Sequence, residues 1–137
     1  MACDSPFFNV LLIDDQAEEA TTVRRILSAL TTEPTCVDHV TKSSAGVGLL
    51  NAYDYDLVLL DNRLSDRISA EFSAPFIRSA RSRAPIAIIS GDINLHYLRR
   101  PEQLGVDYII DKADLVNFLR DQLARKQGQP TSTANRV

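Results

Sequence analysis

Three carboxylates in this chain follow directly after apolar stretches. Asp14 and Asp15 end the stretch at residues 7–13, and Asp61 ends an unbroken apolar run at residues 57–60. Three carboxylates held close together repel one another, and all of them stay ionised only with a cation among them. Oxygen ligands at this density suit Mg²⁺, which keeps several waters and often binds together with a phosphoryl group. The acidic residues therefore indicate a magnesium site, provided that the fold brings them together.

Two further residues would complete such a site around a phosphoryl group. Ser90 follows the apolar residues 86–89, and Lys112 stands two positions after residues 106–110. Lysine supplies a fixed positive charge and serine a hydroxyl donor, and phosphoryl transfer needs mainly such positioning and charge neutralisation. Together with the metal, these side chains describe a site for a phosphoryl group on Asp61. A serine before glycine at a strand end is also common turn chemistry, and this alternative stays open for Ser90.

The hydrophobic pattern of the chain predicts the sheet that would gather these residues. Apolar, β-prone runs alternate with amphipathic stretches about five times along the chain. This alternation predicts an α/β fold, a doubly wound five-stranded parallel sheet flanked by helices. The carboxyl ends of parallel strands lie on one edge of such a sheet, and ligands bind at that edge.

The individual elements follow from the same pattern. We expect strands at residues 7–13, 35–40, 57–60, 86–89 and 106–110, and the more polar second strand nearer a sheet edge. We expect helices at residues 17–30, 41–51, 93–99 and 113–126, with Asp15 as a candidate cap of the first. The start of another helix, before residue 84, is open: Pro75 would kink a long helix but fits the first turn of a shorter one begun by Ser73. Its basic side chains are expected on a solvated face: Arg78, Arg81 and Arg83.

Composition limits the classes of partner. The chain has 137 residues, 45% hydrophobic and 24% charged, which suits one soluble domain. We expect that domain at residues 7–126, followed by a disordered tail at residues 127–137. The net charge of −3 gives no general attraction to nucleic acid or anionic membranes. No apolar run approaches the ~18–20 residues of a membrane span.

The cysteines and the N-terminus bear on the cellular compartment. Cys3 and Cys36 lack metal-ligand spacing, and the terminal position of Cys3 argues against a structural disulfide. The N-terminus has no basic segment before an apolar one, unlike a signal peptide. These features fit a reducing cytoplasm.

On these motifs the sequence resembles a response-regulator receiver domain, the phosphoacceptor half of two-component signalling. An acidic pair, an acceptor aspartate, a hydroxyl residue and a lysine occur in that family's order and approximate spacing over nearly the whole chain. The resemblance implies a flavodoxin-like receiver fold. It also implies that Asp61 takes a phosphoryl group from a phosphohistidine on a histidine kinase or histidine phosphotransferase.

The resemblance further implies a role for each site residue. Mg²⁺ would be held by Asp14, Asp15, Asp61 and the backbone carbonyl of Arg63. Lys112 and Ser90 would contact the acyl phosphate, and Ser90 would follow the phosphoryl group and shift the neighbouring loop and helix.

The sequence departs from the family pattern at several positions. Leu64-Ser65 stands where Met-Pro is common, and Ala113 replaces the proline that usually follows the lysine. The usual aromatic is displaced by one residue, with Tyr108 before Ile109, and such a shift turns a side chain to the opposite face of a strand. We therefore expect Tyr108 to be a packing or surface residue rather than a switch. The side chain of Arg63 could reach a phosphoryl group on Asp61, and we expect it to alter the phosphate lifetime.

The leading hypothesis is a stand-alone signalling domain without enzymatic turnover of its own. It would pass its phosphoryl group on in a phosphorelay or bind a protein target when phosphorylated, without contacting nucleic acid or membranes. One alternative is a binding-only pseudo-receiver that never takes phosphate. A second is a small phosphatase with an aspartyl-phosphate intermediate, which usually has a second acid where this chain has Arg63.

Overall fold

A five-stranded parallel sheet forms the centre of the computed structural model, which describes residues 6–62, 64, 69–92, 95, 98 and 101–128. The strand order is β2-β1-β3-β4-β5, and all four neighbouring pairs are parallel. The strands are β1 (Phe8–Ile13), β2 (Thr35–Val40), β3 (Leu57–Asp61), β4 (Ile86–Ser90) and β5 (Tyr108–Asp111). The predicted doubly wound parallel sheet is confirmed, and so is the position of β2 at an edge.

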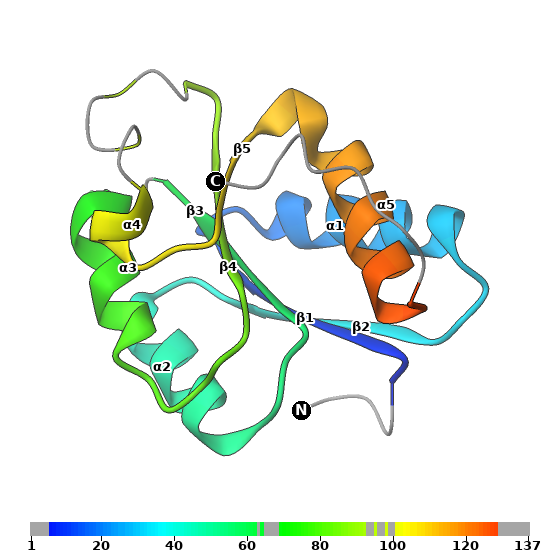
Figure 1. Cartoon of the computed structure of the whole chain (residues 1–137), viewed down its shortest axis with the longest axis horizontal. Coiled ribbons are helices and arrows are strands. Elements are labelled where there is room, and N and C mark those ends of the chain that lie inside the picture. The colour runs from blue at the N-terminus through cyan, green and yellow to red at the C-terminus, as the bar shows by residue number, and fades with distance from the viewer. Residues whose placement is uncertain are drawn as a thin grey trace.

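Helices cover both faces of this sheet (Figure 1). On one face lie α1 (Ala17–Leu30) and α5 (Leu115–Lys126), which is joined to β5 by a short 3₁₀ turn, η2 (Lys112–Asp114). On the other face lie α2 (Ser43–Ala52), α3 (Ala70–Arg78) and α4 (Pro101–Leu104). Within the described ranges, no helix combines the length and apolar character needed to cross a membrane.

Each central strand is buried on both sides, which explains why its residues are apolar apart from Asn9 in β1 and the polar residues at the strand ends. In β1, Val10 and Leu12 point into the core beneath α1 and α5, whereas Leu11 and Ile13 point into the core beneath the other helices. These four side chains are at most 1% exposed. A strand of this kind has no polar face, so the polar residues other than Asn9 come where the strands end.

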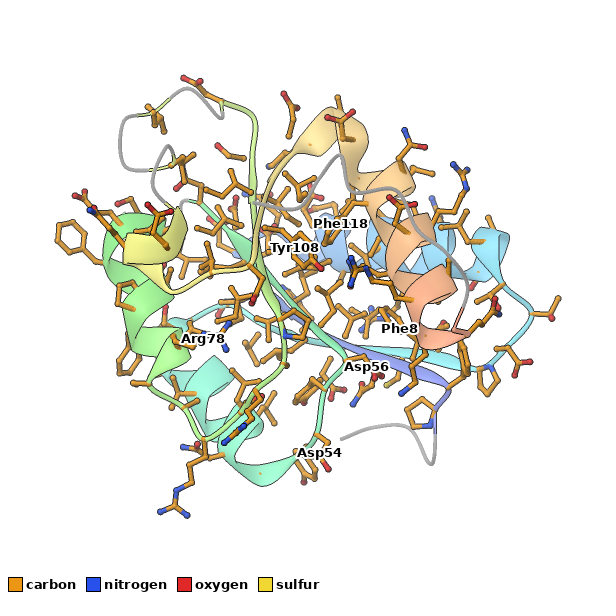
Figure 2. The ribbon with its side chains drawn as sticks, in the orientation of Figure 1. Phe8, Asp54, Asp56, Arg78, Tyr108 and Phe118 are labelled. Carbon is orange, nitrogen blue, oxygen red and sulfur yellow. The ribbon has the colours of Figure 1, made fainter. Side chains whose placement is uncertain are left out.

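Tyr108 belongs to the core between the sheet and α5. It is 6% exposed, and its ring packs edge-on against Phe118 with 5.0 Å between ring centroids (Figure 2). Ile109, the next residue on β5, packs on the opposite face of the sheet. Of the two expected positions for Tyr108, packing and surface, the structure shows the packing one.

Two glycines of α2 give a matched test of this packing. A Cβ added at Gly46 would lie 2.6 Å from Ile13 Cδ1 and 3.4 Å from Ile77 Cδ1, whereas a Cβ at Gly48 would meet nothing within 4 Å. We expect Gly46→Ala to lower the free energy of unfolding by about 1–2 kcal/mol, because overpacking outweighs the gain in helix propensity. Gly48→Ala should raise it by about 0.5–1 kcal/mol. Urea denaturation checks both, and changes of the same sign would contradict this packing.

Two of the predicted helices differ from the structure. α3 begins at Ala70, so Pro75 lies inside it and the shorter helix begun by Ser73 is wrong. The helix predicted at residues 93–99 falls mostly outside the described residues. The helix seen in this region begins at Pro101, where a proline is favoured because the first helical N–H has no partner in any case.

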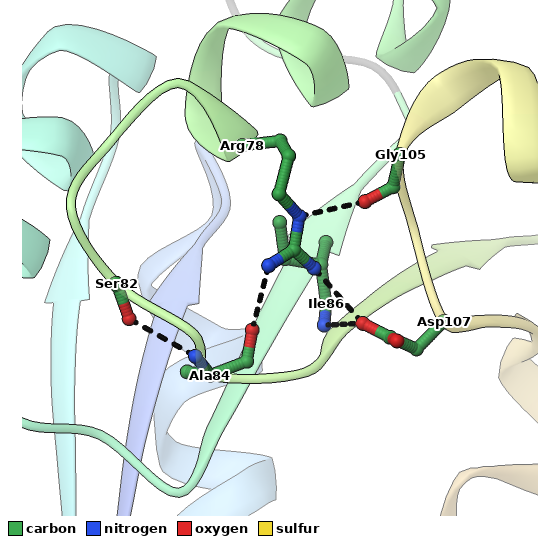
Figure 3. A network of polar contacts seen from close by, with 6 residues as sticks. All are labelled: Arg78, Ser82, Ala84, Ile86, Gly105 and Asp107. Carbon is green, nitrogen blue, oxygen red and sulfur yellow. Dashed lines mark hydrogen bonds and ion pairs between the residues drawn. The ribbon is translucent and has the colours of Figure 1, made fainter.

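Arg78 does not lie on a solvated helix face, contrary to expectation. Its guanidinium group donates to the carbonyls of Gly105 at 2.7 Å and Ala84 at 3.3 Å, and to the carboxylate of Asp107 at 2.9 Å (Figure 3). Asp107 also accepts the N–H of Ile86 at 3.0 Å. Because its partners lie far apart in the sequence, local pattern could not reveal them. The ion pair ties the end of α3 to the starts of β4 and β5.

The state of Cys36 differs from the prediction that the cysteines form no structural disulfide. It is buried on β2, as a small core residue should be, but it is disulfide-bonded. The other cysteine of the sequence, Cys3, lies outside the described residues. The expectation that no structural disulfide forms is therefore wrong.

Candidate functional site

The structure brings the three predicted carboxylates together at the carboxyl end of the sheet. Asp14 and Asp15 follow β1, and Asp61 is the last residue of the neighbouring strand β3. One carboxylate oxygen from each residue lies within 4.8 Å of those of the other two. The chain winds from β1 to β2 on one side and continues through β3 on the other, and ligands of open α/β sheets bind at such a switch point.

These carboxylates suit a magnesium ion. Magnesium ligands stand at 2.0–2.1 Å in an octahedron, so adjacent oxygens are about 3 Å apart and opposite oxygens about 4 Å apart. The oxygens of Asp14, Asp15 and Asp61 are within 4.8 Å of one another and need to approach by at most about 2 Å, which changes in side-chain torsion angles can supply. Asp14 is 3% exposed and Asp61 is 9% exposed, so a cation would relieve repulsion between charges that water screens poorly.

Burial changes the acidity of Asp14. Desolvation raises the pKa of Asp14 to about 6, and the nearby charge of Asp61 adds to this effect. A hydrogen bond of 2.9 Å from the N–H of Gln16 to Asp14 Oδ1 and the charge of Lys112 both favour the ionised form. Gln16 occupies the N-cap position of α1, so the expectation that Asp15 caps this helix is wrong. The side chain that accepts the backbone N–H of the N-cap residue is that of Asp14.

The end of β2 holds the backbone of Asp14. His39 Nε2 lies 2.7 Å from the carbonyl oxygen of Asp14, so this ring nitrogen carries a proton and donates it. The N–H of Asp14 donates to the carbonyl of Val40 at 3.0 Å. His39 is a partly exposed, hydrogen-bonded residue in the structure. Its contact with a candidate metal ligand could not be predicted, because it depends on strand pairing.

A cavity of about 350 Å³ opens beside Asp61. Its walls come from the ends of β3, β4 and β5 and the loop after β4, and are formed by Asp61, Asn62, Ser90, Gly91, Asp92, Leu95 and Lys112. The structure therefore places the predicted serine and lysine around the same space as the predicted acceptor. Lys112 is largely exposed at the rim, and Ser90 is buried. A cavity with a carboxylate, a hydroxyl and an ammonium group can accommodate a phosphoryl group on Asp61.

Ser90 combines turn chemistry with a position in this cavity. Its hydroxyl donates to the carbonyl of Asp92 at 2.9 Å and accepts from the N–H of the same residue at 3.1 Å. It also accepts from Asn62 Nδ2 at 3.4 Å. The turn role that the sequence left open is therefore real, and it does not remove the hydroxyl from the site.

Asn62 and Arg63 directly follow Asp61 in the sequence. Arg63 lies outside the described residues, so the metal contact of its carbonyl stays a prediction. Asn62 was not singled out from the sequence, yet it is 4% exposed and lines the cavity. A signal was present, because an amide directly after a buried strand must find hydrogen-bond partners.

Comparison with known proteins connects this geometry to a family. Residues 10–123 match the response regulator receiver domain family. A comparison with curated proteins found no match.

Solved structures with the same fold include receiver domains from several organisms. One is the signal receiver domain of an HD domain-containing protein from Pseudomonas fluorescens, with a TM-score of 0.70, 18% identity, and coverage of 93% of this chain and 95% of that one. The receiver domain of a sensor histidine kinase from Pseudomonas aeruginosa, with magnesium coordinated in its active-site cleft, gives a TM-score of 0.70, 22% identity, and coverage of 89% and 98%. A CheY-like receiver domain from Methanospirillum hungatei gives a TM-score of 0.70, 18% identity, and coverage of 88% and 97%.

The fold, the acidic cluster and the family match agree. The match spans most of the chain, and the strand ends that it includes carry the carboxylates, the serine and the lysine. The chain belongs to the response regulator receiver domain family of two-component signalling.

Proposed function

We propose that this domain accepts a phosphoryl group on Asp61 from a phosphohistidine of a histidine kinase or histidine phosphotransferase. The observation that carries the proposal is that Asp61 lies both in the acidic cluster and in the wall of the cavity. It belongs to the acidic cluster with Asp14 and Asp15, and it also lines the cavity that contains Ser90 and Lys112. A phosphoryl group on Asp61 would therefore have cation-binding carboxylates on one side and an ammonium and a hydroxyl group on the other.

The proposed step is a transfer from nitrogen to oxygen. A carboxylate oxygen of Asp61 attacks phosphorus, a P–O bond forms, the P–N bond to histidine breaks, and its electron pair returns to the imidazole nitrogen. The product is an acyl phosphate. The ammonium group of Lys112 would neutralise the phosphoryl oxygens, and the hydroxyl of Ser90 would turn from Asp92 to donate to them.

Magnesium is the proposed cofactor. Asp14, Asp15, Asp61 and the backbone carbonyl of Arg63 would hold the ion, which when bound neutralises charge on the phosphoryl group and the carboxylates. The distances among the three carboxylates support this assignment. The magnesium ion in the active-site cleft of the Pseudomonas aeruginosa receiver domain supports it as well.

The output of the domain, at residues 7–126, is either onward transfer of the phosphoryl group or binding of a protein target. We propose a signalling role without enzymatic turnover of a free substrate and without contacts to nucleic acid or membranes. A phosphatase would need a second acid at the position of Arg63, which is basic. A pseudo-receiver would not need the carboxylates, serine and lysine to converge, and their convergence supports the phosphoacceptor.

We place the protein in the cytoplasm, where kinases that use ATP produce phosphohistidine. The disulfide of Cys36 stands against this placement, because disulfides are rare in cytosolic proteins. Alkylation in denaturant, without reductant, and mass measurement of the protein from freshly lysed cells separate the two compartments. A reactive thiol at Cys36 supports the cytoplasm, and a protected one contradicts it.

The experiment that tests the proposed transfer uses phosphoramidate, a small donor with a P–N bond like that of phosphohistidine. We expect incorporation of one phosphoryl group that hydroxylamine removes, because hydroxylamine cleaves acyl phosphates and leaves phosphoserine intact. Mapping should place the group on Asp61. A hydroxylamine-resistant group, or one on another residue, would contradict the proposal.

The side chain of Arg63 is expected to affect loss of the phosphate. A residue two positions after Asp61 in the sequence would bring a guanidinium donor within reach of a phosphoryl group. We expect Arg63→Ala to change the half-life of the acyl phosphate by about threefold or more, as one charge-assisted hydrogen bond would. The half-life is followed by intact mass after removal of the donor, with Arg83→Ala as a control on an exposed arginine away from the cavity. An unchanged half-life in Arg63→Ala would contradict this role.

A further inference from the structure

His39 lies near the carboxyl end of the edge strand β2, beside the loop that carries the acidic pair. On the neighbouring strand β1 it is paired with Leu12, two residues before Asp14. Its side chain is half-buried, and its Nε2 donates to the carbonyl oxygen of Asp14 at 2.7 Å. Strand pairing therefore brings a ring of β2 onto the backbone of a candidate metal ligand.

The hydrogen bond from His39 holds the peptide group between Asp14 and Asp15. A peptide group is planar, so the backbone of a residue is fixed only when the planes on both sides of its Cα are held. The plane before the Cα of Asp14 is held by the bond from its N–H to the carbonyl of Val40 at 3.0 Å. The plane after it carries the carbonyl that His39 contacts. Within the described part of the chain, this plane has no other hydrogen bond.

The side chain of Asp15 depends on this backbone more than that of Asp14 does. Asp14 is 3% exposed, and its Oδ1 accepts the N–H of Gln16 at 2.9 Å. Asp15 is less buried, and its carboxylate forms no hydrogen bond or ion pair with any residue that the structure describes. The course of the backbone is therefore what brings the carboxylate of Asp15 within 4.8 Å of those of Asp14 and Asp61.

We propose that His39 is a positioning residue that holds the carboxylates of Asp14 and Asp15 in the arrangement that binds Mg²⁺. This inference rests on the proposed magnesium site and adds to it a residue that does not contact the ion. The angles ψ of Asp14 and φ of Asp15 set where one carboxylate lies relative to the other, because they flank the same peptide plane. The hydrogen bond from His39 restrains both angles through that plane.

Loss of this hydrogen bond should weaken Mg²⁺ binding. Without it the peptide plane can turn, and the carbonyl of Asp14 favours a turn because a buried acceptor without a partner is costly. The apparent affinity for a ligand falls in proportion to the fraction of molecules in the binding arrangement. One hydrogen bond of ordinary strength changes such a population by about fivefold. We therefore expect the dissociation constant for Mg²⁺ to rise about fivefold when the donor at position 39 is removed.

Magnesium titration followed by two-dimensional NMR of the backbone amides tests this role, because the spectra report both binding and folding. Wild type is compared with His39→Gln, His39→Asn and His39→Leu at neutral pH. The side-chain nitrogen of glutamine lies as many bonds from Cα as Nε2 of His39, so His39→Gln should bind Mg²⁺ within about twofold of wild type. Asparagine ends one bond short and leucine has no donor, so both variants should bind about fivefold more weakly.

Arg24→Met is the matched control. Arg24 Nη2 donates to the carbonyl of Val37, which also lies on β2, at 2.8 Å. Its loss removes a bond from a side chain to the backbone of the same strand, but Val37 is paired with Val10, away from the acidic cluster. Arg24→Met should therefore bind Mg²⁺ within about twofold of wild type. Equal weakening in Arg24→Met and His39→Asn would overturn the inference, because general loosening of β2 would then explain both.

A merely structural role of His39 predicts variants that differ in stability but bind Mg²⁺ equally once folded. Wild-type affinity in His39→Asn, or weak binding in His39→Gln, would contradict the proposed positioning. These two amide variants decide the matter even if His39→Leu does not fold, because they differ by one methylene group. Absence of any Mg²⁺-dependent change in the wild-type spectrum would instead show that the proposed magnesium site is wrong, and this inference would fall with it.

Discussion

Asp14→Asn is expected to stabilise the metal-free protein at pH 7 by about 3 kcal/mol. The pKa of Asp14 is raised from 3.8 to about 6 by burial, so the ionised carboxylate disfavours folding. The difference between the pKa values of Asp14 in the folded and unfolded states corresponds to about 3 kcal/mol at pH 7, because a difference of one in pKa contributes about 1.4 kcal/mol. Asparagine has no charge and keeps an oxygen that can accept the N–H of Gln16.

The sign of this effect can be checked by varying pH. Between about pH 4 and 6 the folded protein binds more protons at Asp14 than the unfolded chain, so this contribution to stability falls as pH rises. Wild type and Asp14→Asn should therefore be similar in stability below about pH 4, and the advantage of the variant should grow between pH 4 and 6 and stay constant above about pH 6. Urea denaturation in the presence of EDTA at pH 4 and pH 7 measures both values. A gap that does not widen between these two pH values would contradict the assignment.

Magnesium should reverse the order of the two proteins. Asp14→Asn removes one of three carboxylates in the cluster and should weaken Mg²⁺ binding about tenfold or more, as loss of groups that merely support ligands already does. Mg²⁺ should therefore stabilise wild type and have little effect on the variant. Asp15→Asn is the matched control. It should weaken Mg²⁺ binding similarly, but its gain in metal-free stability should be smaller because Asp15 is less buried.

Lys112→Ala is expected to slow phosphorylation of Asp61 by acetyl phosphate about tenfold or more. Removing one group that stabilises developing charge in a site without water commonly costs about 10²–10³-fold, and the exposure of Lys112 to solvent should reduce the effect to about tenfold. The charge of Lys112 also lowers the pKa of Asp14, so its loss should move the pH dependence of Mg²⁺ binding to higher pH. Intact mass against time measures the first effect, and Mg²⁺ titration at several pH values the second.

The control for this variant removes the same charge at the other end of the sheet. Lys126 pairs with Asp56 at 2.9 Å, before the start of β3 and away from the cavity. Lys126→Ala should leave the phosphorylation rate within about twofold of wild type, because charges more than a Debye length apart are largely screened. Equal slowing in Lys112→Ala and Lys126→Ala would show that overall charge, and not the position of Lys112, controls the reaction.

The sheet and the convergence of the site could be predicted because both follow from local sequence. A strand buried on both faces is a continuous apolar run, and its end is marked by the first polar residue. Asp14 after β1 and Asp61 at the end of β3 are such residues. Because the strands pair in parallel, Asp14 and Asp61 must then lie at the same edge of the sheet. Their distance of less than 4.8 Å agrees with this argument.

The contacts that could not be predicted join residues far apart in the chain. α3 begins earlier than Pro75 suggests because Asn62, eight positions before Ala70 in the sequence, accepts the first helical N–H. Arg78 donates to the backbone carbonyls of Ala84 and Gly105 and pairs with Asp107, and its basic character alone did not predict these partners. The raised pKa of Asp14 depends on burial by surrounding segments, which the sequence around Asp14 does not specify.

The central claim is that Asp61 is a magnesium-dependent phosphoacceptor. The most direct measurement is the intact mass of the protein after incubation with acetyl phosphate, with Mg²⁺ or with EDTA, for wild type and Asp61→Asn. The account predicts a gain of one phosphoryl group in wild type with Mg²⁺, little or none with EDTA, and none in Asp61→Asn. An equal gain in Asp61→Asn, or a gain in wild type that does not depend on Mg²⁺, would contradict it.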